Sequence, residues 1–165
     1  MKSTKILSVS ALMAALCVVI LSLGSLMESL DISLSIIAGL VVMILATEYG
    51  DRTALSVFSV VSVISVLLPM KSAGVLFFAF FGWYPILQKK LRILKPMLCR
   101  ILSFLLFNGV MILLFILSAY FVGLESYTVY GLLIVLGNVC FYFYDILLDR
   151  FLIWYLLKLR RHLRF

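Results

Sequence analysis

Long runs of apolar residues alternate with short polar segments along this chain. A helix needs about 20 apolar residues to cross a bilayer. Six runs approach that length, at residues 6–27, 32–48, 53–68, 72–87, 101–122 and 129–157. The pattern therefore predicts an all-α polytopic membrane protein, folded as a six-transmembrane-helix bundle in a single domain, residues 1–165.

The polar segments contain residues that turn or end helices. Gly50 lies in the short break between the second and third runs and predicts a tight helical hairpin. Pro69 follows the third run, and proline does not continue a helix. The first apolar run follows Lys2 and Lys5, as the hydrophobic core of a signal peptide follows its basic start. The run is nevertheless long enough to span the bilayer, and we expect it to be retained as the first helix.

Composition agrees with a membrane protein. Hydrophobic residues make up 65% of the chain and charged residues 13%, whereas soluble domains average about 45–50% and about 25%. The net charge of +7 does not indicate nucleic-acid binding, because the basic residues form short clusters between the apolar runs.

Those clusters predict the orientation in the membrane. With the N-terminus inside the cell, twelve of the 14 Lys and Arg residues fall on the inner side, and Lys71 alone lies in an outer loop. The inner ones are Lys2, Lys5, Arg52, Lys89, Lys90, Arg92, Lys95, Arg100, Lys158, Arg160, Arg161 and Arg164. Since basic residues concentrate on the cytoplasmic side, we expect a multi-pass protein of the cell membrane with both termini in the cytoplasm.

Several chemistries lack their residues. The sequence has no phosphate-binding Gly-rich loop and no Gly-x-Ser-x-Gly motif, and its single histidine, His162, lies in a basic tail. Cys17, Cys99 and Cys140 lack metal-ligand spacing and are interpreted as small buried hydrophobic residues. We expect no catalytic residues, no metal site and no cofactor.

Ala11 and Ala15 lie four residues apart on one face of the first predicted helix. Small side chains allow another helix to approach closely, which favours helix association in lipid. The partner helix can belong to the same bundle or to another protein.

This motif, at the start of a short six-helix chain with both ends inside, resembles the S components of energy-coupling factor (ECF) vitamin transporters. In that family the alanine motif packs against a transmembrane T component, and two ATPase subunits supply the energy. The family binds vitamins or metal ions from outside, beneath the loop that joins helices 1 and 2. The resemblance implies the same partners for this chain and does not identify the substrate.

Polar residues of the predicted outer loops are candidates for substrate binding. They are Glu28, Asp31, Lys71, Glu125, Tyr127 and Tyr130. Acidic groups with one lysine suit a cationic or zwitterionic compound; the alternative is ordinary solvation of the loops.

A second set of polar residues lies within the apolar runs. Asn108, Asn138 and Asp145 fall inside the last two predicted helices, and Arg100 and Arg150 are candidate partners of the aspartate. Polar groups at membrane depth face a bundle interior or a cavity. They form either a functional polar site or structural hydrogen bonds between the two helices, and we favour the second interpretation.

Together these patterns predict a substrate-binding subunit of an ECF-type, ATP-driven uptake transporter, with no ATPase activity of its own. One alternative is a small membrane scaffold protein of the cell envelope, similar to the rod-shape protein MreD. Another is a lipid-handling membrane protein that uses Asp145 and the aromatic run at residues 77–84.

Overall fold

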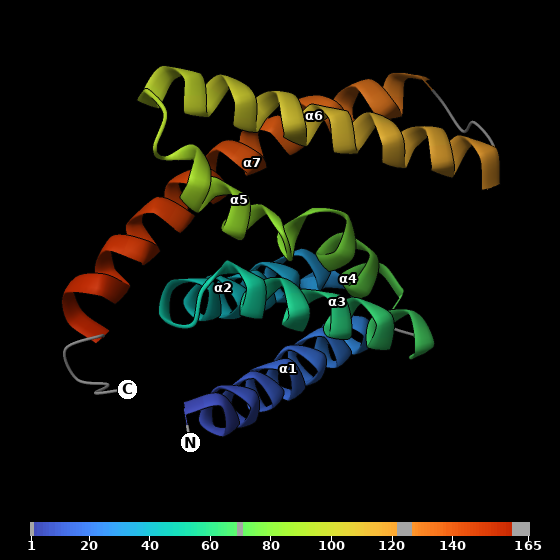
Figure 1. Ribbon diagram of the computed structural model, residues 1–165. Helices are drawn as coiled ribbons and strands as arrows, with labels where there is room; N and C mark the ends of the chain where they lie inside the picture. Colours follow the sequence, from blue (N-terminus) through green and yellow to red (C-terminus); the bar gives the residue numbers. More distant parts are fainter. Residues whose placement is uncertain (1, 69–70, 122–126, 160–165) are drawn as a thin grey trace. The chain divides into compact units, whose positions relative to one another are not determined.

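The computed structural model describes residues 2–68, 71–121 and 127–159, and every regular element within those ranges is helical (Figure 1). The prediction of an all-α protein is therefore confirmed. The chain divides into two compact units, Met1–Lys95 and Pro96–Phe165. A single domain stays a prediction.

The first unit is built around three helices. Helices α1, α2 and α3 contact one another and lie side by side (Figure 1). Shorter helical segments follow them and pack mainly on α2. The bounds are α1 Lys2–Leu26, the 3-10 turn η1 Glu28–Leu30, α2 Asp31–Glu48, α3 Asp51–Leu67, α4 Lys71–Leu76, the π-helical segment η2 Phe77–Phe81 and α5 Tyr84–Leu91.

Small side chains form much of the core of this unit. Fully buried members come from four helices, namely Cys17 of α1, Ala38 and Ala46 of α2, Ala54 of α3 and Ala73 of α4. Small residues let helix backbones approach closely and gain van der Waals contact where lipid provides no hydrophobic drive. Of the three cysteines only Cys17 is buried; Cys99 is half-buried and Cys140 is exposed, so the prediction of three buried cysteines is wrong for Cys140.

The hairpin between α2 and α3 turns at Gly50, as predicted, with φ of 91°. This left-handed conformation favours glycine. Lys89 of α5 stabilises the turn, because its Nζ donates to the carbonyl oxygen of Ala46 at 2.8 Å and lies 3.2 Å from Asp51 Oδ1. Lys90 Nζ lies 3.5 Å from the other carboxylate oxygen of Asp51. These contacts join the end of α2, the start of α3 and α5.

The predicted fourth span, residues 72–87, is not one regular α-helix. It is broken into α4, the π-helical segment η2 and α5, and the Gly82 amide donates to the Phe77 carbonyl at 2.8 Å, five residues back. Pro85 has no amide hydrogen to continue the α-helical pattern. The indole Nε1 of Trp83 donates to the carbonyl oxygen of Ala79 at 2.9 Å. The side chain thus satisfies a backbone acceptor near the break.

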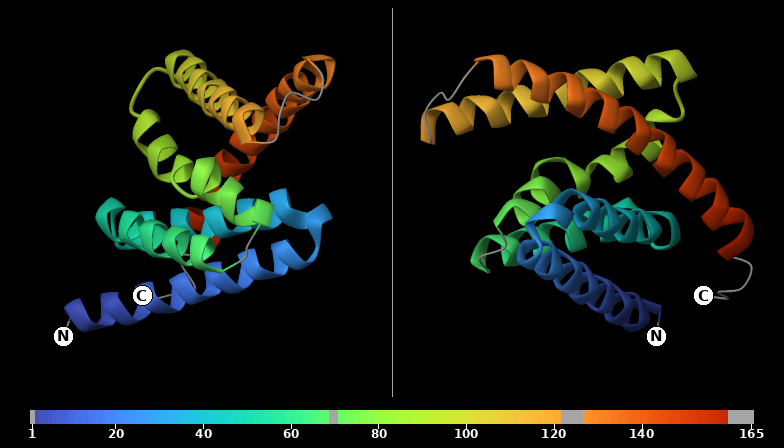
Figure 2. Two further views of the ribbon diagram at one scale, coloured as in Figure 1. Left: turned by 90° about the vertical axis from the view of Figure 1, so that its right-hand side faces the viewer. Right: turned by 180° about the vertical axis from the view of Figure 1, so that it is seen from behind.

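The second unit contains two long helices that cross (Figure 2). They are α6 (Pro96–Phe121) and α7 (Tyr127–Trp154), and the π-helical segment η3 (Tyr155–Leu159) follows α7. The ring of Phe141 stacks on Phe107 with centroids 4.5 Å apart and meets Phe104 edge-on at 5.1 Å. These aromatic contacts hold the two helices together.

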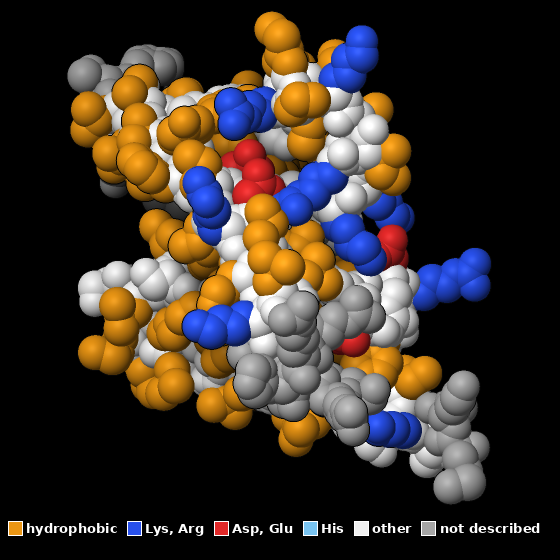
Figure 3. Space-filling model, turned by 90° about the vertical axis from the view of Figure 1, so that its left-hand side faces the viewer, with side chains coloured by type: hydrophobic (Ala, Val, Ile, Leu, Met, Phe, Trp, Pro, Cys, Tyr) orange, Lys and Arg blue, Asp and Glu red, His pale blue; other side chains and the backbone are white. Residues whose placement is uncertain are grey.

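Within the described residues, four helical segments are long and apolar enough to cross a membrane: Thr4–Leu26, Asp31–Glu48, Pro96–Tyr120 and Gly131–Lys158. Six spans stay a prediction. Large hydrophobic side chains are widely exposed, among them Leu7, Leu12, Val66 and Ile116. One face of the molecule shows orange hydrophobic side chains between blue basic ones (Figure 3). Since soluble proteins rarely expose so much apolar surface, these are features of a multi-pass membrane protein.

Gly82 is required by the close approach of α3 to the π-helical segment. A Cβ atom at this position would lie 2.5 Å from Cδ2 of Phe58 and 2.9 Å from Cε1 of Phe77. These two rings already contact each other, with centroids 5.8 Å apart. We expect Gly82→Ala to destabilise the first unit by about 1–3 kcal/mol through overpacking, measured as a lower midpoint of thermal unfolding in detergent.

Gly109 provides the matched control, because a Cβ there meets nothing within 4 Å. Gly109→Ala should leave the midpoint unchanged or raise it, since alanine favours helix over glycine. Equal destabilisation by the two substitutions would contradict the packing argument.

Candidate functional site

Asp31 is a buried carboxylate at the first turn of α2, with only 6% of its surface exposed. The 3-10 turn η1 leads directly into it, and the amide of Leu30 donates to the carbonyl oxygen of Met27 at 2.8 Å. An acidic residue is favourable here because the first turn of a helix has free amide hydrogens and a partial positive charge. The local structure therefore explains why an aspartate is tolerated, but not why it is buried.

The two carboxylate oxygens of Asp31 have different surroundings. Oδ2 accepts a hydrogen bond from the hydroxyl of Ser72, in the first turn of α4 and 41 residues along the chain. Oδ1 is buried and has no hydrogen-bond partner among the residues that the structure describes. A buried acceptor without a donor is costly, by about 1–3 kcal/mol. Oδ1 is thus a buried acceptor to which no described residue donates.

Other small residues close the space around this carboxylate. Ser35 Oγ lies 2.7 Å from the carbonyl oxygen of Asp31 and 2.9 Å from that of Ala73, so its proton links α2 to α4. On α1, a Cβ at Gly24 would lie 3.0 Å from Ala73 Cβ and 3.7 Å from Asp31 Oδ1. Segments from α1, α2 and α4 therefore meet at the carboxylate.

This arrangement can bind a positively charged or hydrogen-bond-donating group. A buried carboxylate with an unsatisfied oxygen favours a cation or an ammonium group. No group of three or more His, Cys, Asp or Glu side chains that could hold a metal ion occurs in the described part of the chain. The described polar contact of the carboxylate is the hydroxyl of Ser72.

The structure does not describe the other predicted outer-loop side chains. Glu125 lies outside the described residues, as do the side chains of Glu28, Lys71, Tyr127 and Tyr130. Their assignment to substrate binding stays a prediction. Sequence reasoning selected Asp31 but missed Ser72, Ser35 and Gly24. Ser35, four residues after Asp31 on the same helix face, was the available signal.

The intramembrane asparagines form a reciprocal pair between α6 and α7. Asn108 Nδ2 donates to Asn138 Oδ1 at 2.9 Å, and Asn138 Nδ2 donates to Asn108 Oδ1 at 3.0 Å. Each amide also donates to the carbonyl oxygen four residues earlier, Phe104 or Ile134, at 2.8 Å. With all four N–H groups used, this pair has the geometry of structural hydrogen bonding between helices.

Arg100 and Asp145 are placed apart from that pair. Arg100 is exposed at the start of α6 and makes no ion pair or hydrogen bond with any residue that the structure describes. Asp145 is half-buried on α7, two turns beyond Asn138. Of the residues predicted to form a polar cluster, the structure brings Asn108 and Asn138 into contact with each other.

Ala11 and Ala15 are exposed on α1, although two residues between them, Met13 and Ala14, pack against the core. The exposed face continues with the apolar side chains of Leu12 and Leu16. Within the first unit, therefore, the alanine pair does not serve interior packing, and its face is open to another surface.

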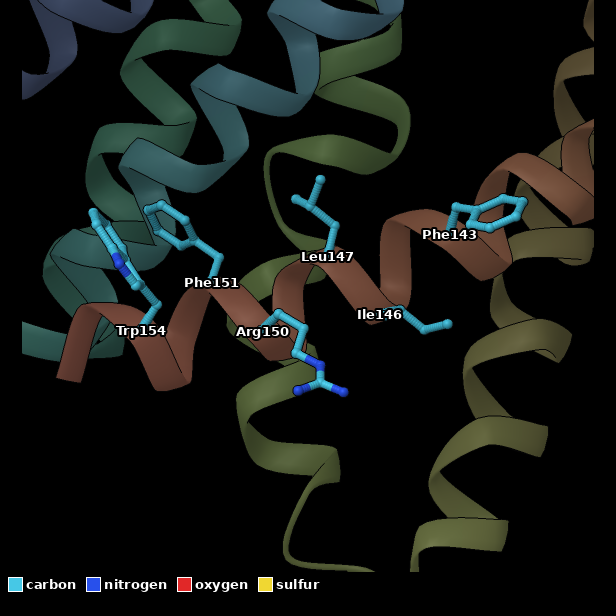
Figure 4. A pocket seen from close by; sticks show the side chains of 6 residues that line it. All are labelled: Phe143, Ile146, Leu147, Arg150, Phe151 and Trp154. Atoms are coloured by element: carbon cyan, nitrogen blue, oxygen red, sulfur yellow. The ribbon is translucent and has the colours of Figure 1, made fainter. Parts of the chain in front are cut away.

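A shallow pocket on α7 is a weaker candidate. It is lined by Phe143, Ile146, Leu147, Arg150, Phe151 and Trp154. All six residues belong to one helix, and their side chains fan out along it instead of converging (Figure 4). A helix surface of this kind does not enclose a solute.

The asparagine pair can be tested with a double-mutant cycle. Asn108→Leu or Asn138→Leu alone leaves the other amide without its partner in the membrane interior, so each should lower the free energy of unfolding, by about 0.6–1.7 kcal/mol. The double substitution removes both polar groups and should cost less than the sum of the two. Denaturant titration in detergent measures the three variants; additive effects would show that the amides are not coupled.

Comparisons with protein-family models, with curated proteins and with solved structures found no match to this chain.

Proposed function

We propose that this chain is the substrate-binding membrane subunit of an ATP-driven uptake system of the ECF type. It spans the cell membrane six times with both termini in the cytoplasm. It binds a small cationic or zwitterionic solute from outside. A T component and two ATPase subunits are its partners and supply the energy, since the sequence has no nucleotide-binding loop.

The Asp31 site carries this proposal. Its carboxylate is more than nine-tenths buried, and Oδ1 has no partner within the described residues. A cationic group of a solute would supply the missing donor, with the hydroxyl of Ser72 fixing the carboxylate orientation. Binding of this kind gains from the low dielectric of the site, where a charge-assisted hydrogen bond is strong.

The charge distribution within the first unit supports the orientation. Gly24, Asp31 and Ser72 meet at one end of the helices, whereas Gly50 and Lys89 lie at the turn between the opposite ends of α2 and α3. Exposed basic residues near that turn include Arg52 and Lys90. The positive-inside tendency then directs the Asp31 end outward, where an uptake protein meets its solute.

Asp31→Asn tests the binding site. It keeps the shape of the side chain and an acceptor for Ser72 but removes the charge. We expect the wild-type protein, purified in mild detergent, to retain a cationic or zwitterionic small molecule that mass spectrometry identifies. Asp31→Asn should retain at most about one tenth as much of this molecule. A tenfold loss corresponds to roughly 1.4 kcal/mol of binding free energy, and a desolvated charge pair contributes more than that.

Asp51→Asn is the matched control. It removes one carboxylate from the same unit, but from the Lys89 and Lys90 ion pairs at the other end. Solute retention should be unchanged. A wild-type protein that carries no such molecule, or equal loss in both variants, would count against Asp31 as the anchoring residue.

The alanine face tests the partners. Ala11→Trp with Ala15→Trp places two large side chains on an exposed face, which should block close approach of a partner helix. We expect loss of co-purified T component and ATPases, with the solute still retained. Val60→Trp with Val63→Trp, at two exposed positions of α3, is the control and should keep the partners. Association that survives the alanine substitutions would contradict the ECF assignment and favour a scaffold function.

A further inference from the structure

A groove lies between α1 and α3, away from the Asp31 site. Its lining residues are Ile6, Leu7, Ser10, Arg52, Thr53 and Ser56, and its volume is about 560 Å³. Those from α1 lie near the start of that helix, and those from α3 lie in its first two turns, after the turn at Gly50. The groove therefore opens at the end of the first unit that the charges predict to face the cytoplasm.

Arg52 provides a free positive charge in this groove. Its side chain is exposed and has no ion pair or hydrogen bond with a described residue. The neighbouring carboxylate of Asp51 is already engaged by Lys89 and Lys90, at 3.2 and 3.5 Å. No acidic side chain is among the described residues that line the groove, and exposed Lys5 precedes Ile6 on α1. Charge complementarity thus favours an anion, and a guanidinium suits a phosphate.

The hydroxyl groups of the groove are arranged as acceptors. Each hydroxyl donates to the backbone carbonyl oxygen four residues earlier on its own helix. Ser10 Oγ donates to that of Ile6 at 2.8 Å, Thr53 Oγ1 to that of Tyr49 at 3.1 Å, and Ser56 Oγ to that of Arg52 at 3.0 Å. Their protons are therefore directed to their own helices, and lone pairs on the three oxygens remain for a donor. A ligand with hydroxyl groups beside its phosphate would satisfy both the arginine and these oxygens.

Apolar surface continues from the groove along α3. Leu7 of α1 is 71% exposed beside the groove, and Val60 and Val63 are exposed four and seven residues after Ser56 on the same face of α3. A ligand with acyl chains could lie along these side chains. A soluble phosphate compound would leave this surface unused.

We propose that the groove between α1 and α3 binds an anionic phospholipid whose headgroup carries hydroxyl groups, as phosphatidylglycerol does. The phosphate contacts the Arg52 guanidinium, the headgroup hydroxyls donate to the oxygens of Ser10, Thr53 and Ser56, and the acyl chains follow Leu7 and the apolar face of α3. Basic pockets between helices on the cytoplasmic side are suited to such headgroups. This site is independent of solute binding at Asp31.

Native mass spectrometry of the full chain tests this proposal. The protein is offered phosphatidylglycerol, phosphatidic acid or phosphatidylcholine with the same acyl chains. Wild-type protein should retain phosphatidylglycerol more than the other two lipids. Arg52→Gln should lower its retention about fivefold, and Arg52→Lys should restore much of it. Ser10→Ala with Ser56→Ala should remove the preference for phosphatidylglycerol over phosphatidic acid.

Lys95→Gln is the matched control, because it removes an exposed basic charge that does not line the groove. It should leave lipid retention unchanged, and circular dichroism should show the same helical content in all variants. Three results would overturn the proposal: equal retention of phosphatidylcholine, equal effects of Arg52→Gln and Lys95→Gln, or displacement of the lipid by millimolar inorganic phosphate.

Discussion

Hydrogen-bonding groups within a bilayer must find their partners inside the protein, because lipid offers none. This chain meets that requirement largely by local means. Serine and threonine hydroxyls along its helices donate to carbonyls one turn earlier, as Ser22, Ser65 and Thr47 do. The paired amides of Asn108 and Asn138 meet it between helices. Against this background, Asp31 Oδ1 is one of several buried side-chain oxygens without a hydrogen-bond partner among the described residues, and it is the carboxylate oxygen of that set, whose burial costs most.

The same constraint explains how the segment after α4 departs from a regular helix. Bulky aromatic residues from Phe77 to Phe81 occupy a π-helical turn, and Pro85 contributes no amide hydrogen. The indole of Trp83 supplies a donor to Ala79, and Gly82 lets Phe58 approach the backbone. The break is thus accommodated by side chains of the protein.

The first unit has chemically different ends. At one end a buried carboxylate lies among small residues from three helices. At the other, Lys89 and Lys90 engage Asp51, and the Arg52 side chain has no ion pair with a described residue. An acidic interior site at one end of the helices and a basic surface at the other agree with the proposed solute site and the proposed lipid site.

The sequence by itself determined the helical class, the four longest apolar helices, the Gly50 turn and the uneven distribution of charge, because these depend on residue type and local spacing. It also selected Asp31, but not Ser72, whose contact with it spans 41 positions of the chain. Only the tertiary structure decided which faces are interior. On α1, Leu12 is exposed while Leu21 is fully buried. Since lipid and protein interior accept the same apolar side chains, hydrophobicity cannot distinguish those faces, and the contacts between helices must do so.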